Sequence, residues 1–135
     1  MTRTVFLLAL LVFSAFSCSK EKDQVTPLEE FPAIVTQVEA PETAIVGSTV
    51  PIKVYFRVNN GCGEFNFFEV DEPGYAIHTI KVFPKYREGF CTLDLPTREV
   101  TYEFKPTNPG TYTLKFFAGF PEEYIIKAIV VNPES

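Results

Sequence analysis

The segment from Val50 to Val58 places an apolar side chain at every second position, with mainly polar residues between them. Residues 100–105 and 112–116 repeat this period of two, with Thr, Glu and Lys at the alternate positions. Because successive side chains of a strand point to opposite faces, each segment predicts a β-strand with one buried face.

Four further segments predict strands with a less regular pattern: 33–39, 65–70, 75–83 and 124–131. The last is apolar on both faces apart from Lys127, so we expect it to be covered twice or to lie at an interface. No long stretch has helical 3.6-residue spacing, and eleven prolines interrupt the chain. About seven strands with frequent turns predict an all-β, antiparallel sandwich, a single domain over residues 33–132 with a short tail at 133–135.

Residues 108–114, Asn-Pro-Gly-Thr-Tyr-Thr-Leu, resemble the Asp-x-Gly-x-Tyr-x-Cys corner of immunoglobulin domains. The resemblance implies that Gly110 permits the turn before a strand and that the Tyr112 hydroxyl bonds to the upstream backbone. Leu114 replaces the family cysteine, the 50–58 strand has no cysteine, and the chain has no Trp. The chain is therefore similar to cysteine-less bacterial immunoglobulin-like or fibronectin-type sandwiches.

The N-terminus has a different pattern. Arg3 precedes the short apolar run from Val5 to Phe13, and small residues lead to Cys18, which predicts a secretory signal peptide over residues 1–17. Cys18 at the cleavage point resembles the lipobox of bacterial lipoproteins, which implies acylation of this thiol and a membrane anchor. Ala15 and Ser17 also suit an ordinary signal peptidase cutting at the same bond, so simple secretion is the alternative.

The polar segment 18–32 predicts a flexible tether. Its charged beginning resembles the tethers of outer-membrane lipoproteins, including Bacteroidota ones, and implies an exported protein facing the periplasm or the cell surface. The formal charge of −5 is spread along the chain. Without a cluster of Lys and Arg, the chain does not have the composition of a nucleic-acid-binding protein.

Cys62 and Cys91 remain as one pair once Cys18 is assigned to the anchor. In a sandwich whose connections alternate between two ends, the loops 59–64, 84–96 and 118–122 share one end. Both thiols then lie at the same rim, and Gly61 and Gly63 suit a tight turn facing another loop. We predict a disulfide bond that stabilises the fold by about 3–4 kcal/mol.

Few residues suggest catalysis. His78 is the only histidine, and neither Ser48 nor Ser135 sits in a nucleophile elbow. Copper and zinc sites need more His, Cys or Met than the mature chain offers. The acidic run Glu69, Asp71, Glu72 lacks the spacing of a calcium loop. We predict no cofactor, no metal site and no enzymatic activity.

Aromatic residues are the remaining signal, with fourteen phenylalanines in the chain. Two interpretations stay open. The predicted rim, Phe65, Phe90 and Phe120 with Asn59 and Asn60, forms an apolar recognition surface. Alternatively the three Phe side chains fold over the core as a hydrophobic lid, which we favour because disulfide-tied loops often pack inward.

These observations predict a non-catalytic, lipid-anchored envelope protein that acts as a binding or structural accessory module and presents the rim loops away from the membrane. The expected partner is another envelope protein. One alternative is an inhibitor or chaperone-like module that acts by strand or loop insertion, with Ile125, Ile129 and Val131 on the second face of the last strand. A glycan-binding module is another, and its candidate residues are Tyr75, Tyr86, Asn59 and Asn60.

Overall fold

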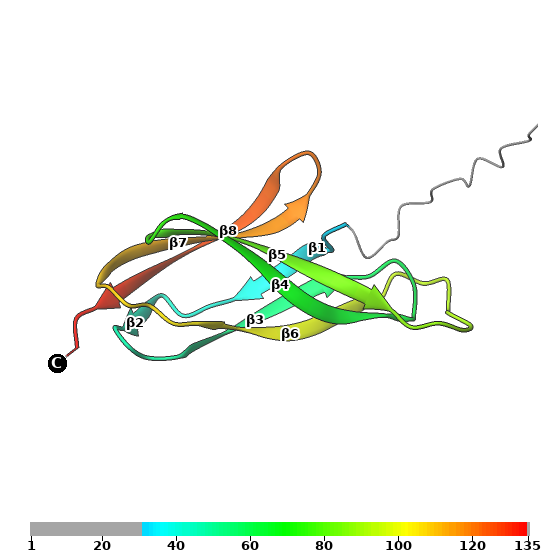
Figure 1. Ribbon diagram of the computed structural model, residues 1–135, viewed down its shortest axis with the longest axis horizontal. Coiled ribbons are helices and arrows are strands. Elements are labelled where there is room, and N and C mark those ends of the chain that lie inside the picture. The colour runs from blue at the N-terminus through cyan, green and yellow to red at the C-terminus, as the bar shows by residue number, and fades with distance from the viewer. Residues whose placement is uncertain (1–30, 135) are drawn as a thin grey trace, which may run out of the picture.

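The computed structural model describes residues 31–134 and shows an all-β sandwich (Figure 1). No helix occurs within this range. The predicted signal peptide, Cys18 and most of the predicted tether lie outside the described residues. The strands are β1 (Ile34–Glu39), β2 (Thr43–Ile45), β3 (Val50–Arg57), β4 (Gly63–Gly74), β5 (Ile77–Tyr86), β6 (Thr97–Phe104), β7 (Gly110–Gly119) and β8 (Glu123–Asn132).

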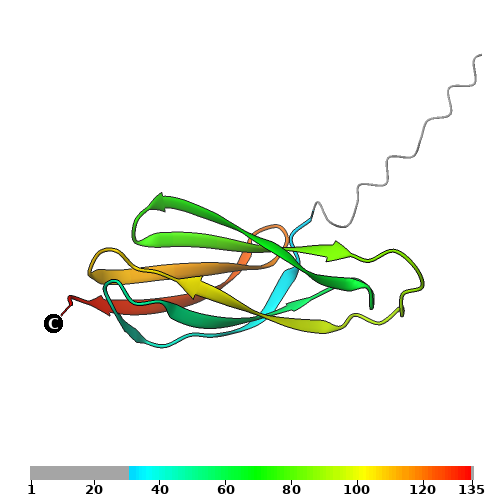
Figure 2. The same cartoon turned by 60° about the horizontal axis from the view of Figure 1, so that its bottom comes forward.

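The strands form two sheets that face each other (Figure 2). One has three strands in the order β1-β3-β6, and the other has five in the order β2-β8-β7-β5-β4. The rows of alternating apolar residues account for this packing. Val54 and Phe56 of β3 face Leu114 and Phe116 of β7 across one shared hydrophobic core, and all four side chains are fully buried.

Two strand pairings differ from the antiparallel prediction. β2, which the sequence did not predict as a strand, pairs in parallel with the end of β8, and β5 pairs in parallel with β7. In an immunoglobulin sheet the third core strand lies beside the sixth, whereas here the later strand of the β4–β5 hairpin takes that place. β4 is the edge strand of this sheet, and its charged residues Glu69, Asp71 and Glu72 are of the kind that suits an edge.

The apolar last strand is not covered on both faces. Ile129 and Val131 of β8 point into the core, while Ile126 and Val130 are exposed on the outer face of the five-stranded sheet. Of the three residues expected on the free second face of this strand, Ile129 and Val131 are therefore core residues. β8 also lies between β7 and β2, so β2 already pairs with its last three residues. This arrangement removes the main argument for strand addition at the C-terminal half of β8.

Candidate functional site at the disulfide end

The connections that follow β3 and β5 meet at one end of the sandwich, which we call the disulfide end. The predicted bond between Cys62 and Cys91 is present there, with Cα atoms 5.2 Å apart. Backbone hydrogen bonds reinforce it: Gly61 N–H donates to the Thr92 carbonyl (2.9 Å), and Arg87 N–H donates to the Cys62 carbonyl (3.1 Å). The 87–96 loop is thus held by the disulfide bond and by backbone hydrogen bonds to the turn that contains Gly61 and Cys62.

The two glycines beside Cys62 are required by close approach. A Cβ atom on Gly61 would collide with the Thr92 side chain, and one on Gly63 would lie 2.8 Å from an aromatic carbon of Tyr86. These positions have no room for a side chain because the turn packs directly against the 87–96 loop and the end of β5. Glycine therefore allows the two segments to come close enough for the disulfide bond.

Arg98 is a structural residue that the sequence analysis missed. Its Nε donates to the Gly63 carbonyl (2.9 Å) and its Nη2 to the Gly61 carbonyl (3.1 Å), on either side of Cys62. In the alternation of β6, Arg98 occupies the same inward-facing row as Val100 and Tyr102. The sequence could have indicated this role, because Arg98 falls in the inward-facing row of an alternating strand. A cation in such a position needs hydrogen-bond acceptors inside the protein.

The aromatic residues of the predicted rim do not act as one unit. Phe65 packs inward against Phe56 and Phe68, with ring centroids 6.4 and 4.8 Å away. Phe120 is 60 % exposed and rests on Phe117, and Phe90 is fully exposed. The lid interpretation is therefore right for Phe65 and wrong for Phe90 and Phe120. The disulfide pins the loop through Cys91, but the neighbouring ring projects away from the core.

Two more apolar side chains of the same loop are exposed. Leu93 is 95 % exposed and Leu95 more than half exposed, while the residues between Gly89 and Leu93 carry no charge. In Figures 1 and 2 this β5–β6 connection, coloured between green and yellow, forms the end of the molecule opposite the C-terminus. Single exposed apolar residues are normal, but three on one fixed loop form an apolar tip. We call Phe90, Leu93 and Leu95 the loop tip.

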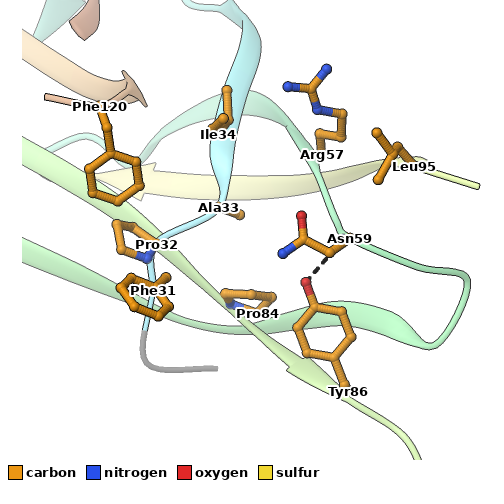
Figure 3. Close-up of a pocket in the computed structure, with 10 residues that line it drawn as sticks. All are labelled: Phe31, Pro32, Ala33, Ile34, Arg57, Asn59, Pro84, Tyr86, Leu95 and Phe120. Carbon is orange, nitrogen blue, oxygen red and sulfur yellow. Dashed lines mark hydrogen bonds between the residues drawn. The ribbon is translucent and has the colours of Figure 1, made fainter. Parts of the chain in front are cut away.

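A hollow of about 270 Å³ lies next to the loop tip (Figure 3). It is smaller than the roughly 300–1,000 Å³ of drug-sized ligand sites. Tyr86 accepts a hydrogen bond from the backbone N–H of Asn59 (3.1 Å) inside it. Its lining comes from the start of the described chain, the ends of β3 and β5 and two loops: Phe31, Pro32, Ala33, Ile34, Arg57, Asn59, Pro84, Tyr86, Leu95 and Phe120.

The lining also locates the N-terminal side of the domain. Phe31 and Pro32 share the hollow with Asn59 and Phe120, so the chain enters the sandwich at the disulfide end. This entry point follows from the register of β1, whose first residue Ile34 pairs with Arg57 at the end of β3. It does not favour the prediction that an N-terminal anchor leaves the rim loops facing away from the membrane, but the anchor itself lies outside the described residues.

The asparagines and tyrosines proposed for glycan binding are not brought together. Asn60 Oδ1 accepts a hydrogen bond from Cys62 N–H (2.9 Å), so this side chain supports the turn. Asn59 and Tyr86 line the hollow, but Tyr75 lies at the other end of β5 against Tyr112. The alternative glycan site thus loses one of its two aromatic rings.

The opposite end contains the tyrosine motif, and we call it the tyrosine end. The Tyr112 hydroxyl donates to the Asn108 carbonyl (2.9 Å) and accepts from Asn108 N–H (3.2 Å). Gly110 has a φ of +133°, a conformation that residues with a Cβ rarely adopt. The ring of Tyr112 is 2 % exposed and packs against Phe104 and His78. Hydrogen bonds and ring packing hold this end.

His78 is part of the packing at the tyrosine end. It is 7 % exposed, its Nε2 lies 3.0 Å from the Tyr75 carbonyl, and its Nδ1 lies 3.7 Å from Glu72. Both rim cysteines are in the disulfide bond at the other end, so His78 forms no dyad with them. Burial, together with the charge of Glu72, raises the pKa of the Tyr102 hydroxyl above its usual value.

Within residues 31–134, no group of three His, Cys, Asp or Glu side chains is placed to hold a metal ion. The same part of the chain has no helix long and apolar enough to cross a membrane. Comparisons with protein-family models, with curated proteins and with solved structures found no match to this chain.

Proposed function

We propose that this chain is an exported, non-catalytic envelope lipoprotein whose immunoglobulin-like sandwich serves as a binding or structural accessory module through its disulfide end. One observation supports this site above all others. The 87–96 loop is fixed by the Cys62–Cys91 bond and by backbone hydrogen bonds, yet its apolar side chains face solvent. A partner that covers these side chains would account for their exposure.

Physical chemistry favours binding at such a loop. Apolar side chains in a folded protein are stabilised by burial, and Phe90 and Leu93 receive none from their own domain. A loop already held in one conformation loses little entropy when a partner binds, so more of the contact energy appears as affinity. Rigid aromatic side chains are also the usual anchors of interfaces.

Export is supported by the disulfide bond together with the N-terminal sequence. Disulfides persist mainly in oxidising compartments, and the segment before Cys18 has the pattern of a signal peptide. Acylation of Cys18 places the domain on a membrane, and the resemblance of the tether favours the outer membrane. The partner at the disulfide end is then a component of the same envelope.

The anchor is tested by Cys18→Ser in the native host. We expect the protein to move from the membrane fraction to the soluble fraction, because the acylated thiol is lost. Mass spectrometry of the wild-type protein checks the same point by the added mass of the acyl chains on Cys18. An unchanged membrane fraction, with an unmodified thiol in the wild type, rejects lipidation.

The binding site is tested by a photocrosslinking amino acid placed at position 90 of the full chain in intact cells. We expect a crosslinked product, to lipid or to protein, because a bound partner covers the loop tip. The matched control carries the same group at position 75, another exposed aromatic position, at the tyrosine end. Equal products at both positions, or none at either, reject the disulfide end as the binding site.

A further inference from the structure

We propose that the loop tip docks onto the surface of a lipid bilayer, with Phe90 and Leu93 inserted among the headgroups. This inference deepens the proposed function and rests on it, because it names the partner of the same disulfide end. The occupant is a membrane and not a second protein. Three features support this choice: where the chain enters the domain, the chemistry of the tip, and the support beneath it.

The first feature is the position of the N-terminal side. Phe31 lines the same hollow as Leu95, at the end of the sandwich that carries the loop tip. From Cys18 to Phe31 there are 31 − 18 = 13 residue steps, which span at most roughly 45 Å when fully extended. An acyl anchor at Cys18 therefore joins the domain at its disulfide end, which leaves the loop tip within reach of the bilayer.

The second feature is the chemistry of the tip. Residues 89–93, Gly-Phe-Cys-Thr-Leu, are uncharged and include two fully or almost fully exposed apolar side chains. Charges of both signs flank them, Arg87 with Glu88 on one side and Asp94 on the other, so the tip has no cluster of basic side chains to attract an anionic surface. The tip therefore fits an electrically neutral lipid surface, to which apolar side chains bind by burial and not by charge attraction.

The third feature is the support beneath the tip. The disulfide bond and the Gly61–Thr92 hydrogen bond hold the loop while Phe90 projects from it. Peptide groups without partners are unfavourable in hydrocarbon, so insertion is limited to the side chains. The structure therefore predicts shallow insertion at the interface, with the sandwich outside the bilayer.

The absence of Trp from the sequence makes a direct test simple. Phe90→Trp in the full chain provides a single tryptophan at the tip, which can be excited selectively over the six tyrosines, and Tyr75→Trp provides the matched control at the tyrosine end. Each variant is reconstituted into phosphatidylcholine vesicles whose acyl chains carry bromine near the headgroup, a short-range quencher. We expect strong quenching and a shift to shorter wavelength for Phe90→Trp only.

A second measurement removes the anchor, because an acylated chain stays on vesicles whatever its tip does. In the Cys18→Ser background, cosedimentation with phosphatidylcholine vesicles reports the contribution of the tip alone. Burying a large apolar side chain favours binding enough that Phe90→Ser should weaken partitioning roughly tenfold or more. Ile126→Ser, at another exposed apolar position on β8, should leave partitioning unchanged, and added salt should not release the protein.

Unquenched fluorescence of Phe90→Trp on vesicles, or release of the protein by salt, overturns membrane docking. A crosslink from position 90 to a protein, without quenching by brominated lipid, also overturns it but supports the proposed binding function. If position 90 neither crosslinks in cells nor is quenched, both proposals fail. Quenching that persists without acylation of Cys18 supports membrane docking independently of the anchor.

Discussion

The two ends of this sandwich use aromatic residues in opposite ways. At the tyrosine end, Tyr112, His78 and Phe104 pack against one another and are almost completely buried. At the disulfide end, Phe90 has no burial, and Phe120 has only part of it. The tyrosine end is held by the packing of its own rings, whereas the disulfide end is held by Cys62–Cys91 and Arg98 beneath rings that face solvent.

The difference shows how a small domain can keep an apolar surface exposed. A loop normally holds its conformation by burying some of its side chains, which removes them from any partner. The disulfide bond and backbone hydrogen bonds hold the 87–96 loop without this burial, so its apolar side chains stay accessible. Stability and binding should therefore be separable at the disulfide end, whereas the buried rings of the tyrosine end contribute to stability.

The largest expected effect is loss of the disulfide bond. The double variant Cys62→Ala/Cys91→Ala should lower the free energy of unfolding by about 3–4 kcal/mol, because the unfolded chain gains conformational freedom. For a domain of this size the melting temperature should fall by roughly 10–20 °C. Thermal unfolding by circular dichroism measures it, and a reducing agent should have the same effect on the wild type but none on the variant. A wild-type melting curve would contradict the assignment of stability to the bond.

Removal of the Arg98 guanidinium should have the next largest effect. Arg98→Met keeps most of the side-chain volume but leaves the carbonyls of Gly61 and Gly63 without this donor, which should destabilise the fold by about 2–3 kcal/mol. Urea denaturation measures the change. Arg57→Met, on the exposed face of the neighbouring strand β3, is the control and should be close to neutral. Equal stabilities of the two variants would mean that Arg98 does not support the turn.

At the tyrosine end, Tyr112→Phe removes one hydroxyl and preserves the ring. The loss of its hydrogen bonds to Asn108 should lower the free energy of unfolding by about 1 kcal/mol. Tyr55→Phe, at a half-buried position on β3, is the matched control and should change stability less. If the two variants are equally stable, the corner hydroxyl contributes nothing, and ring packing alone holds this end.

The smallest effect on stability should come from the loop tip itself. Phe90→Ser should change the free energy of unfolding by less than about 0.5 kcal/mol, as is usual for exposed positions. The same variant should lose most of its vesicle binding, so denaturation and cosedimentation are measured on one sample. A destabilisation above about 1 kcal/mol would show that the ring supports the fold, and would remove the contrast between the two ends.

Much of the fold could be predicted from the alternation of apolar and polar residues. The row Val50, Ile52, Val54 and Phe56 is buried as predicted, because a period of two assigns side chains to faces whatever the neighbouring strands are. The disulfide bond was also predictable. Alternate connections of a sandwich lie at the same end, and only one pair of cysteines remained once Cys18 was set aside. The all-β sandwich follows from the same pattern.

The neighbours of each strand were not predictable in this way. Both strands of the β4–β5 hairpin alternate, so the pattern does not tell which of them pairs with β7; the parallel β5–β7 ladder depends on the whole sheet. The short β2 has no pattern of its own and forms through the end of β8.

The sequence alone determined which face each side chain of a strand occupies, because this depends on local periodicity. It also determined the pairing of the cysteines, because only two remained to pair. Tertiary structure decided that Arg98 supports the cysteine turn, that Phe90 and Leu93 face solvent while Phe65 does not, and that Phe31 enters at the disulfide end. These outcomes depend on contacts between residues far apart in the chain. Local sequence says that a loop side chain is apolar, but only the packing around the loop decides whether that side chain is covered.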